Sequence, residues 1–129
     1  MKNIPNIGDT RVYKKKVVEE DQAAFHGSVL HAVCSTFALA RDMEWSSRLF
    51  FLDMKEDDEE GVGTHLTIDH KSPAFVGEEL TFTATAKQIK ENELICDIVV
   101  KAEERTIAIG KTGQRMLKKD RLQKLFTRP

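Results

Sequence analysis

The sequence has few cysteines, no long apolar run and little excess charge of either sign. Its two cysteines, Cys34 and Cys96, are far apart. Because they form no CxxC pair, we expect neither a zinc knuckle nor a disulfide framework, and we expect both thiols to be reduced and buried. No stretch of about 18 apolar residues is present, and the N-terminus lacks the apolar core of a signal peptide. The sequence therefore predicts a cytoplasmic protein with no membrane partner.

The charged residues nearly cancel. Twenty Lys and Arg stand against 21 Asp and Glu, which leaves a net charge of -1. This balance gives no overall attraction to a phosphate backbone, so nucleic acid is not expected as a partner. The sequence also contains no internal repeat and no linker rich in Pro, Gly and Ser. We therefore expect one domain over residues 1–129, with its core at about 10–117 and a short basic tail at 118–129.

The secondary structure follows from periodicity. Residues 36–54 are rich in helix formers and contain no Gly or Pro, which predicts a long helix. Apolar residues cover much of its circumference, so we expect it to be buried on more than one side. The acidic segment 55–61 is expected to be a solvated loop, and the tail a short helix. Alternation of apolar and polar residues predicts strands at 10–19, 62–70, 79–90, 93–103 and 105–117.

These elements predict an α+β fold. A central helix with one strand before it and four after it indicates a curved antiparallel sheet wrapped around the helix, which is the layout of the hotdog fold. His26 and His31 precede the helix and lack the Glu and the helical context of a zinc-hydrolase motif. We expect these two histidines to line a loop beside the site.

His70 stands where a buried strand would normally carry an aliphatic residue. In simple alternation it shares a face with Val62, Thr64, Leu66 and Ile68, whereas Gly63 lies on the opposite face. In apolar surroundings a neutral imidazole can accept or donate a proton near pH 7. The alternative is a core histidine that is hydrogen-bonded to a carbonyl group.

Two polar residues of the predicted helix are further candidates. Glu44 lies among apolar residues, where an ionised carboxylate needs a partner. That partner is either Arg41 or Arg48 in an ion pair on the helix surface, or the imidazole of a catalytic site. Thr36 opens the helix and is either an N-cap, a role that Ser35 would also serve, or a catalytic hydroxyl.

Two segments carry a family resemblance. VCSTFALARDMEW, at 33–45, and GTHLTIDHKSPAFVG, at 63–77, resemble the signature segments of the thioesterases related to fluoroacetyl-CoA thioesterase. In that family a Thr opens the central helix and a Glu follows eight residues later. A later strand carries Gly-Thr and then a His before a Pro and a Gly. The matching residues here are Thr36, Glu44, Gly63 and His70.

The resemblance implies a hotdog-fold enzyme that hydrolyses an acyl-CoA or acyl-carrier thioester, as a homodimer or a dimer of dimers. Coenzyme A would be part of the substrate, and no metal or other cofactor is implied. Thr36, Glu44 and His70 would be catalytic: water or Thr36 attacks the carbonyl, His70 transfers the proton, and Glu44 orients His70 or acts as a base. The runner-up functions are an enoyl-thioester hydratase and a noncatalytic acyl-thioester binding protein.

The residues around the helix start would bind the substrate. Gly63 either lets the backbone approach the substrate or simply opens a strand. Ser35 and Phe37 stand where many family members have Ala and Pro around the Thr, so they bear on the choice of acyl group. In a regular helix, Thr36 and Glu44 would be roughly 12 Å apart. They therefore either span the thioester or meet across a subunit interface.

Overall fold

The computed structural model describes all 129 residues. Its elements in chain order are β1 (Thr10–Lys16), the 3-10 helix η1 (Glu19–Asp21), β2 (Gln22–Phe25), β3 (Ser28–Cys34), α1 (Thr36–Met54), β4 (Glu59–His70), β5 (Glu79–Lys90), β6 (Glu93–Ala102), β7 (Arg105–Lys118) and α2 (Lys119–Leu125). The long helix and the three strands after β4 agree closely with the predicted ranges, and the basic tail forms α2. Neither helix combines the length and the apolar character needed to span a bilayer.

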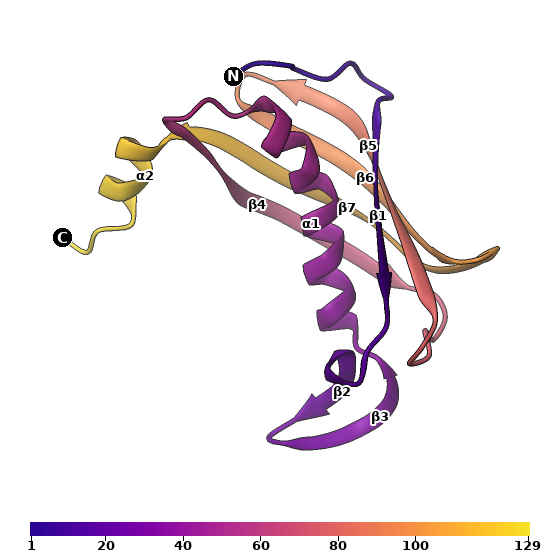
Figure 1. Cartoon of the computed structure of the whole chain (residues 1–129). Coiled ribbons are helices and arrows are strands. Elements are labelled where there is room, and N and C mark those ends of the chain that lie inside the picture. The colour runs from indigo at the N-terminus through magenta and orange to yellow at the C-terminus, as the bar shows by residue number, and fades with distance from the viewer.

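The large sheet wraps around the long helix. Five antiparallel strands form it in the order β1-β5-β6-β7-β4, and α1 lies across its inner face (Figure 1). This is the predicted α+β layout of a central helix in a curved antiparallel sheet. Because β1 and β4 are the outer strands, each has one edge that pairs with no other strand of the chain.

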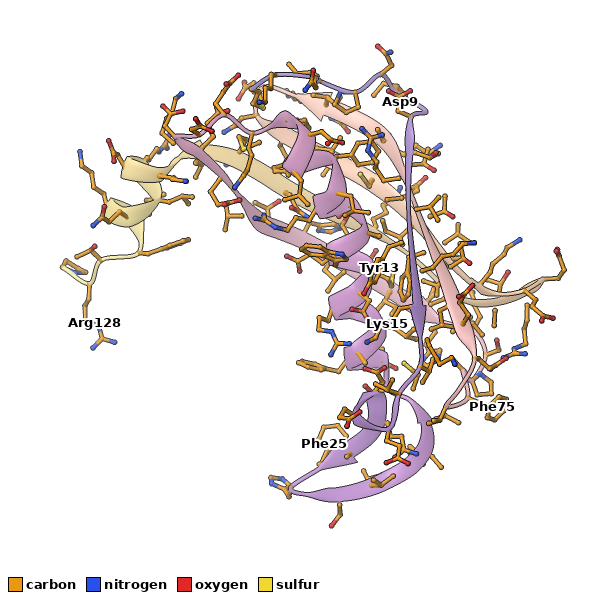
Figure 2. The ribbon with its side chains drawn as sticks, in the orientation of Figure 1. Asp9, Tyr13, Lys15, Phe25, Phe75 and Arg128 are labelled. Carbon is orange, nitrogen blue, oxygen red and sulfur yellow. The ribbon has the colours of Figure 1, made fainter.

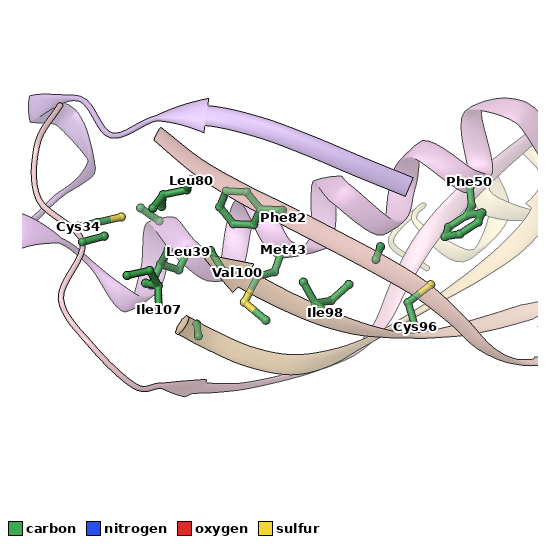
Figure 3. Close-up of a cluster of buried hydrophobic side chains, with 14 of the residues drawn as sticks. Cys34, Leu39, Met43, Phe50, Leu80, Phe82, Cys96, Ile98, Val100 and Ile107 are labelled. Atoms are coloured by element: carbon green, nitrogen blue, oxygen red, sulfur yellow. The ribbon is translucent and has the colours of Figure 1, made fainter. Parts of the chain in front are cut away.

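The core fills the space between α1 and the sheet. Leu39, Met43 and Phe50 of the helix pack with alternate residues of β5, β6 and β7 (Figure 3). Both cysteines are buried, as predicted, and burial raises the pKa of Cys34 to about 11 and that of Cys96 to about 12. Both therefore remain protonated thiols near neutral pH, and neither is activated as a nucleophile.

The segment before α1 was predicted to be a loop and is instead a β-hairpin. β2 pairs antiparallel with β3, and the hairpin projects beyond the first turn of α1 (Figure 1). His26 and Gly27 form the turn, with φ values of 53° and 80°. Two consecutive residues with positive φ are typical of the tight turns that match the twist of paired strands. Phe25, Val29 and Leu30 are exposed on this hairpin, and Figure 2 labels Phe25 on it.

The prediction that α1 is buried on more than one side is wrong. The sheet covers one face, and the opposite face has no other element of the chain over it. Phe37 is 81% exposed, and Trp45 and Leu52 are also exposed. Apolar residues around the whole circumference of a helix show that every side is suited to burial. They do not show that another part of the same chain covers every side.

The acidic segment is less loop-like than predicted. β4 begins at Glu59, inside that segment, and three carboxylates of the segment form ion pairs, the first of them Asp58 with Lys118. Glu59 pairs with the N-terminal amino group at 3.0 Å. Glu60 pairs with Arg48 and Lys55, and these cations lower its pKa to about 2. This part of the acidic run therefore fastens the end of α1 to the start of β4.

Candidate active site

A hydrogen bond joins the first residue of α1 to the last residue of β4. Thr36 Oγ1 lies 2.9 Å from His70 Nδ1. The Thr36 hydroxyl is available for this contact because Ser35 is the N-cap, and its Oγ accepts from Ala38 N at 2.9 Å. Of the two roles left open for Thr36, the capping role thus belongs to Ser35. A hydroxyl bonded to an imidazole is the arrangement of an activated nucleophile and its base.

The second imidazole nitrogen of His70 has no partner. Nε2 is buried and forms no hydrogen bond within the chain. When the Thr36 hydroxyl donates to Nδ1, the proton of a neutral imidazole sits on Nε2. That buried N–H then lacks an acceptor, which is an unfavourable state for a polar group. His70 is therefore not the core histidine with a carbonyl partner that was the alternative prediction.

Glu44 forms no ion pair within the chain. Its two predicted helix partners are engaged elsewhere, because Arg41 pairs with Asp42 and Arg48 pairs with Glu60. The side chain of Glu44 is exposed and lies over Gly63. A Cβ atom at that glycine would stand 2.6 Å from Glu44 Oε1. Gly63 therefore provides the space in which the carboxylate lies.

A β-bulge brings Gly63 and His70 to the same side of the sheet. The pairing of β4 with β7 shifts register between Gly63 and His65. Simple alternation placed Gly63 opposite to His70, and that prediction is wrong because the extra residue reverses the alternation. Both residues face α1, since Gly63 approaches Glu44 and His70 approaches Thr36.

The catalytic candidates form two separate groups within one chain. Thr36 lies with His70 at the end of β4, and Glu44 lies with Gly63 nearer its start. The strand between Gly63 and His70 is long enough to separate them by roughly 20 Å. The predicted direct pairing of Glu44 with His70 is therefore not formed within a single chain.

The two predicted substrate-binding residues of the helix start differ in availability. Ser35 uses its hydroxyl to cap α1, so its side chain has a structural role. Phe37 has no such contact and lines two hollows. One hollow lies beside β2 and includes Phe25, and the other includes Glu44 and Leu66. Phe37 is therefore the residue of this pair that is free to contact a substrate.

Sequence reasoning missed a group of buried polar residues beneath Glu44. Ser47 of α1 contacts Thr112 and Gln114 of β7. The available signal was a pair of polar residues at alternate, inward-facing positions of the last predicted strand. Inward polar residues in an antiparallel strand are uncommon enough to be candidates for a role beyond packing.

Comparisons with known proteins agree with this architecture. A thioesterase superfamily member of Thermus thermophilus is 26% identical, with a TM-score of 0.92 over 98% of this chain and 93% of that chain. A hot-dog-like protein of Thermanaerovibrio acidaminovorans is 20% identical, with a TM-score of 0.83 over 95% of this chain and 94% of the other. These neighbours confirm the predicted hotdog fold. No curated protein matches the chain.

The fluoroacetyl-CoA thioesterase FlK is also similar in structure. It is 15% identical, with a TM-score of 0.86 over 96% of this chain and 98% of that chain. A family model described as FlK, fluoroacetyl-CoA-specific thioesterase, matches residues 17–120. This range includes both groups of catalytic candidates, and it confirms the predicted resemblance and the predicted hydrolysis of a thioester. The chain belongs to the FlK thioesterase family.

Proposed function

We propose that the protein hydrolyses an acyl-CoA thioester at a site built by two copies of the chain. The hydrogen bond between Thr36 and His70 is the observation that carries this proposal. It supplies a nucleophile and a base on two elements that the core holds rigidly together. Structures of FlK variants have been determined with acetyl-CoA and with fluoroacetate and CoA, which supports coenzyme A as the thiol of the substrate.

The proposed reaction has two steps. The Thr36 hydroxyl attacks the thioester carbonyl while its proton moves to His70 Nδ1, and the C–S bond then breaks as the thiol takes that proton. Water then attacks the acyl-Thr36 ester while its proton moves to His70. The ester C–O bond breaks as Thr36 Oγ1 takes this proton back from His70, and the free acid leaves. The residues of the chain move every proton in this scheme, so the proposal requires no metal or redox cofactor.

The start of α1 is suited to hold the oxyanion that forms at the carbonyl. The backbone N–H groups of Thr36 and Phe37 have no hydrogen-bond partner within the chain. They lie at the positive end of a 19-residue helix. Two N–H donors beside the attacking hydroxyl are the arrangement that stabilises a tetrahedral intermediate.

A second copy of the chain would complete the site. In an antiparallel, two-fold pairing of β4 with β4 centred on Thr67, the extra residue of the bulge brings Gly63 of the partner subunit opposite His70. Glu44 of the partner subunit then lies close to His70. Its carboxylate would stabilise the imidazolium that forms when His70 takes a proton.

The surface around the free edge of β4 supports this pairing. Leu66 is exposed on that strand, and Phe37 and Trp45 are exposed on the uncovered face of α1. An unpaired strand edge beside exposed apolar side chains is a surface that a second chain can cover.

We expect the protein to be a dimer or a dimer of dimers in solution. Light scattering at micromolar concentration should then give a mass of at least twice the 14.7 kDa of one chain. A fully active species of 14.7 kDa would contradict the shared site.

We expect release of free thiol from at least one short or medium acyl-CoA. A thiol reagent would follow the reaction across a panel of acyl chains, with His70→Ala as the control for nonenzymatic hydrolysis. Binding of acyl-CoA without thiol release by the folded protein would instead indicate a binding protein. Formation of a hydrated product with the thioester intact would indicate a hydratase.

A further inference from the structure

A buried polar cluster lies beneath Glu44. It consists of Ser47 of α1 and of Thr112 and Gln114 of β7, and all three are almost fully buried. Thr112 Oγ1 donates to Ser47 Oγ at 2.8 Å, and Gln114 Nε2 donates to the same oxygen at 3.0 Å. The Ser47 hydroxyl therefore accepts two hydrogen bonds from the sheet.

The cluster converges on the backbone carbonyl of Glu44. Ser47 Oγ donates to Glu44 O at 2.9 Å, and Gln114 Nε2 donates to it at 3.1 Å. A carbonyl inside an α-helix already accepts the N–H of the residue four positions later. These two donors are therefore not needed to satisfy Glu44 O, and they fasten this turn of α1 to the sheet.

The position of Gln114 links the backbone of Glu44 to its carboxylate. Gln114 is the partner of Gly63 in the pairing of β7 with β4. The carboxylate of Glu44 lies over Gly63. Gln114 thus binds the carbonyl of Glu44, and its neighbour on the adjacent strand, Gly63, lies beneath the carboxylate of Glu44.

Packing alone does not account for three polar side chains at this place. Burial of an amide and two hydroxyls is unfavourable, and internal hydrogen bonds largely offset that cost without a large net gain. Apolar residues of the same shape can replace all the partners of a buried hydrogen bond with little loss of stability. A connected network does provide a single geometry, since each member fixes the orientation of the next.

We propose that Ser47, Thr112 and Gln114 are positioning residues for Glu44. They hold its helix turn at a fixed height above Gly63, so that the carboxylate reaches the imidazole of the partner subunit with the correct geometry. This inference rests on the proposed function, in which Glu44 serves a site shared between two subunits.

Isosteric variants test the inference. Thr112→Val and Gln114→Met remove the donors and keep the volume, and each is expected to lower kcat by about 10-fold to 100-fold, because small displacements of a catalytic group have effects of this size. KM should change by less than about threefold, since neither residue contacts substrate. Thr112→Ser retains the hydroxyl, so the kcat of this variant should stay near the wild-type value. This result would not be expected if Thr112 only filled space.

Ser46 provides a matched control for Ser47. It is the adjacent residue, it is fully buried, and its Oγ donates to Met43 O at 2.6 Å, but it does not contact the Glu44 carbonyl. Ser47→Ala should lower kcat, whereas Ser46→Ala should leave kcat near wild type. Urea unfolding of each variant would show whether the kinetic differences exceed the differences in stability. Equal losses of kcat in the two serine variants would overturn the inference.

A Glu44→Gln background separates this inference from the proposed function. If Gln114 acts through Glu44, Gln114→Met should add little to the loss already caused by Glu44→Gln. A full additional loss in the double variant would mean that Gln114 acts elsewhere. If Glu44→Gln alone left turnover unchanged, the shared catalytic role of Glu44 would fail. If Thr112→Val and Gln114→Met had normal turnover while Glu44→Gln was impaired, the positioning role would be wrong and the catalytic role of Glu44 would stand.

Discussion

Replacement of His70 by alanine is expected to lower thioesterase turnover by about 10² to 10⁴, the usual contribution of a positioned acid or base. The reason is its hydrogen bond to the Thr36 hydroxyl, which has no other acceptor among the side chains of the chain. Without the imidazole, the hydroxyl keeps its proton and remains a poor nucleophile. The rate of thiol release at saturating acyl-CoA measures this loss.

The same replacement is expected to change the free energy of unfolding little. Within its own chain His70 makes one side-chain hydrogen bond, to Thr36, and its Nε2 atom has no partner there. The loss of this bond and of the packing around the ring is partly offset because a polar ring no longer has to be held away from water. Urea unfolding would measure the balance, and it would show whether lost activity reflects lost structure.

A histidine on the same strand provides the control. His65 is exposed, and the Thr36 hydroxyl bonds to His70 and not to His65. His65→Ala should therefore retain turnover close to the wild type. If His70→Ala kept near-normal turnover, or lost activity only in proportion to the unfolded fraction, the proposed mechanism would be wrong.

The long, strongly periodic elements were the part of the fold that the sequence could predict. The bounds of α1 were predicted correctly because helix formers continue without Gly or Pro from Thr36 to Met54. The β-hairpin before α1 was not predicted, because its strands are short and its turn depends on a positive φ at His26, a residue with only a weak preference for that conformation.

The sequence pointed to candidate residues for the site but did not predict its geometry. Thr36 and His70 were chosen from the family resemblance, and the structure brings them into contact. The side of the sheet on which Gly63 lies was predicted wrongly, because one bulged residue reverses alternation and leaves no clear mark in the sequence. The distance of Glu44 from His70 could not be predicted either, since it depends on the direction in which α1 crosses β4.

Mixed dimers provide the sharpest test of the shared site. Glu44→Gln is expected to lower turnover by about 10² or more, because the neutral amide cannot stabilise the imidazolium of the partner subunit. A dimer that combines one Glu44→Gln chain with one His70→Ala chain should nevertheless regain activity. In that dimer, His70 of the first chain meets Glu44 of the second, which gives one intact site and one site that lacks both groups.

Co-expression of the two chains with different affinity tags would isolate the mixed dimer, and we expect about half of the wild-type turnover per dimer, since one of its two sites is intact. A Thr36→Ala chain paired with a His70→Ala chain is the matched control. Thr36 and His70 form their hydrogen bond within one chain, so neither site of that dimer is complete and no activity should return. If the Glu44→Gln and His70→Ala pair also stayed inactive, Glu44 would not act across the interface. Recovery in that pair alone would assign Glu44 to the site of the partner subunit. If Glu44 and His70 acted within one chain, each chain of the mixed dimer would lack one of the two residues and no site would be complete.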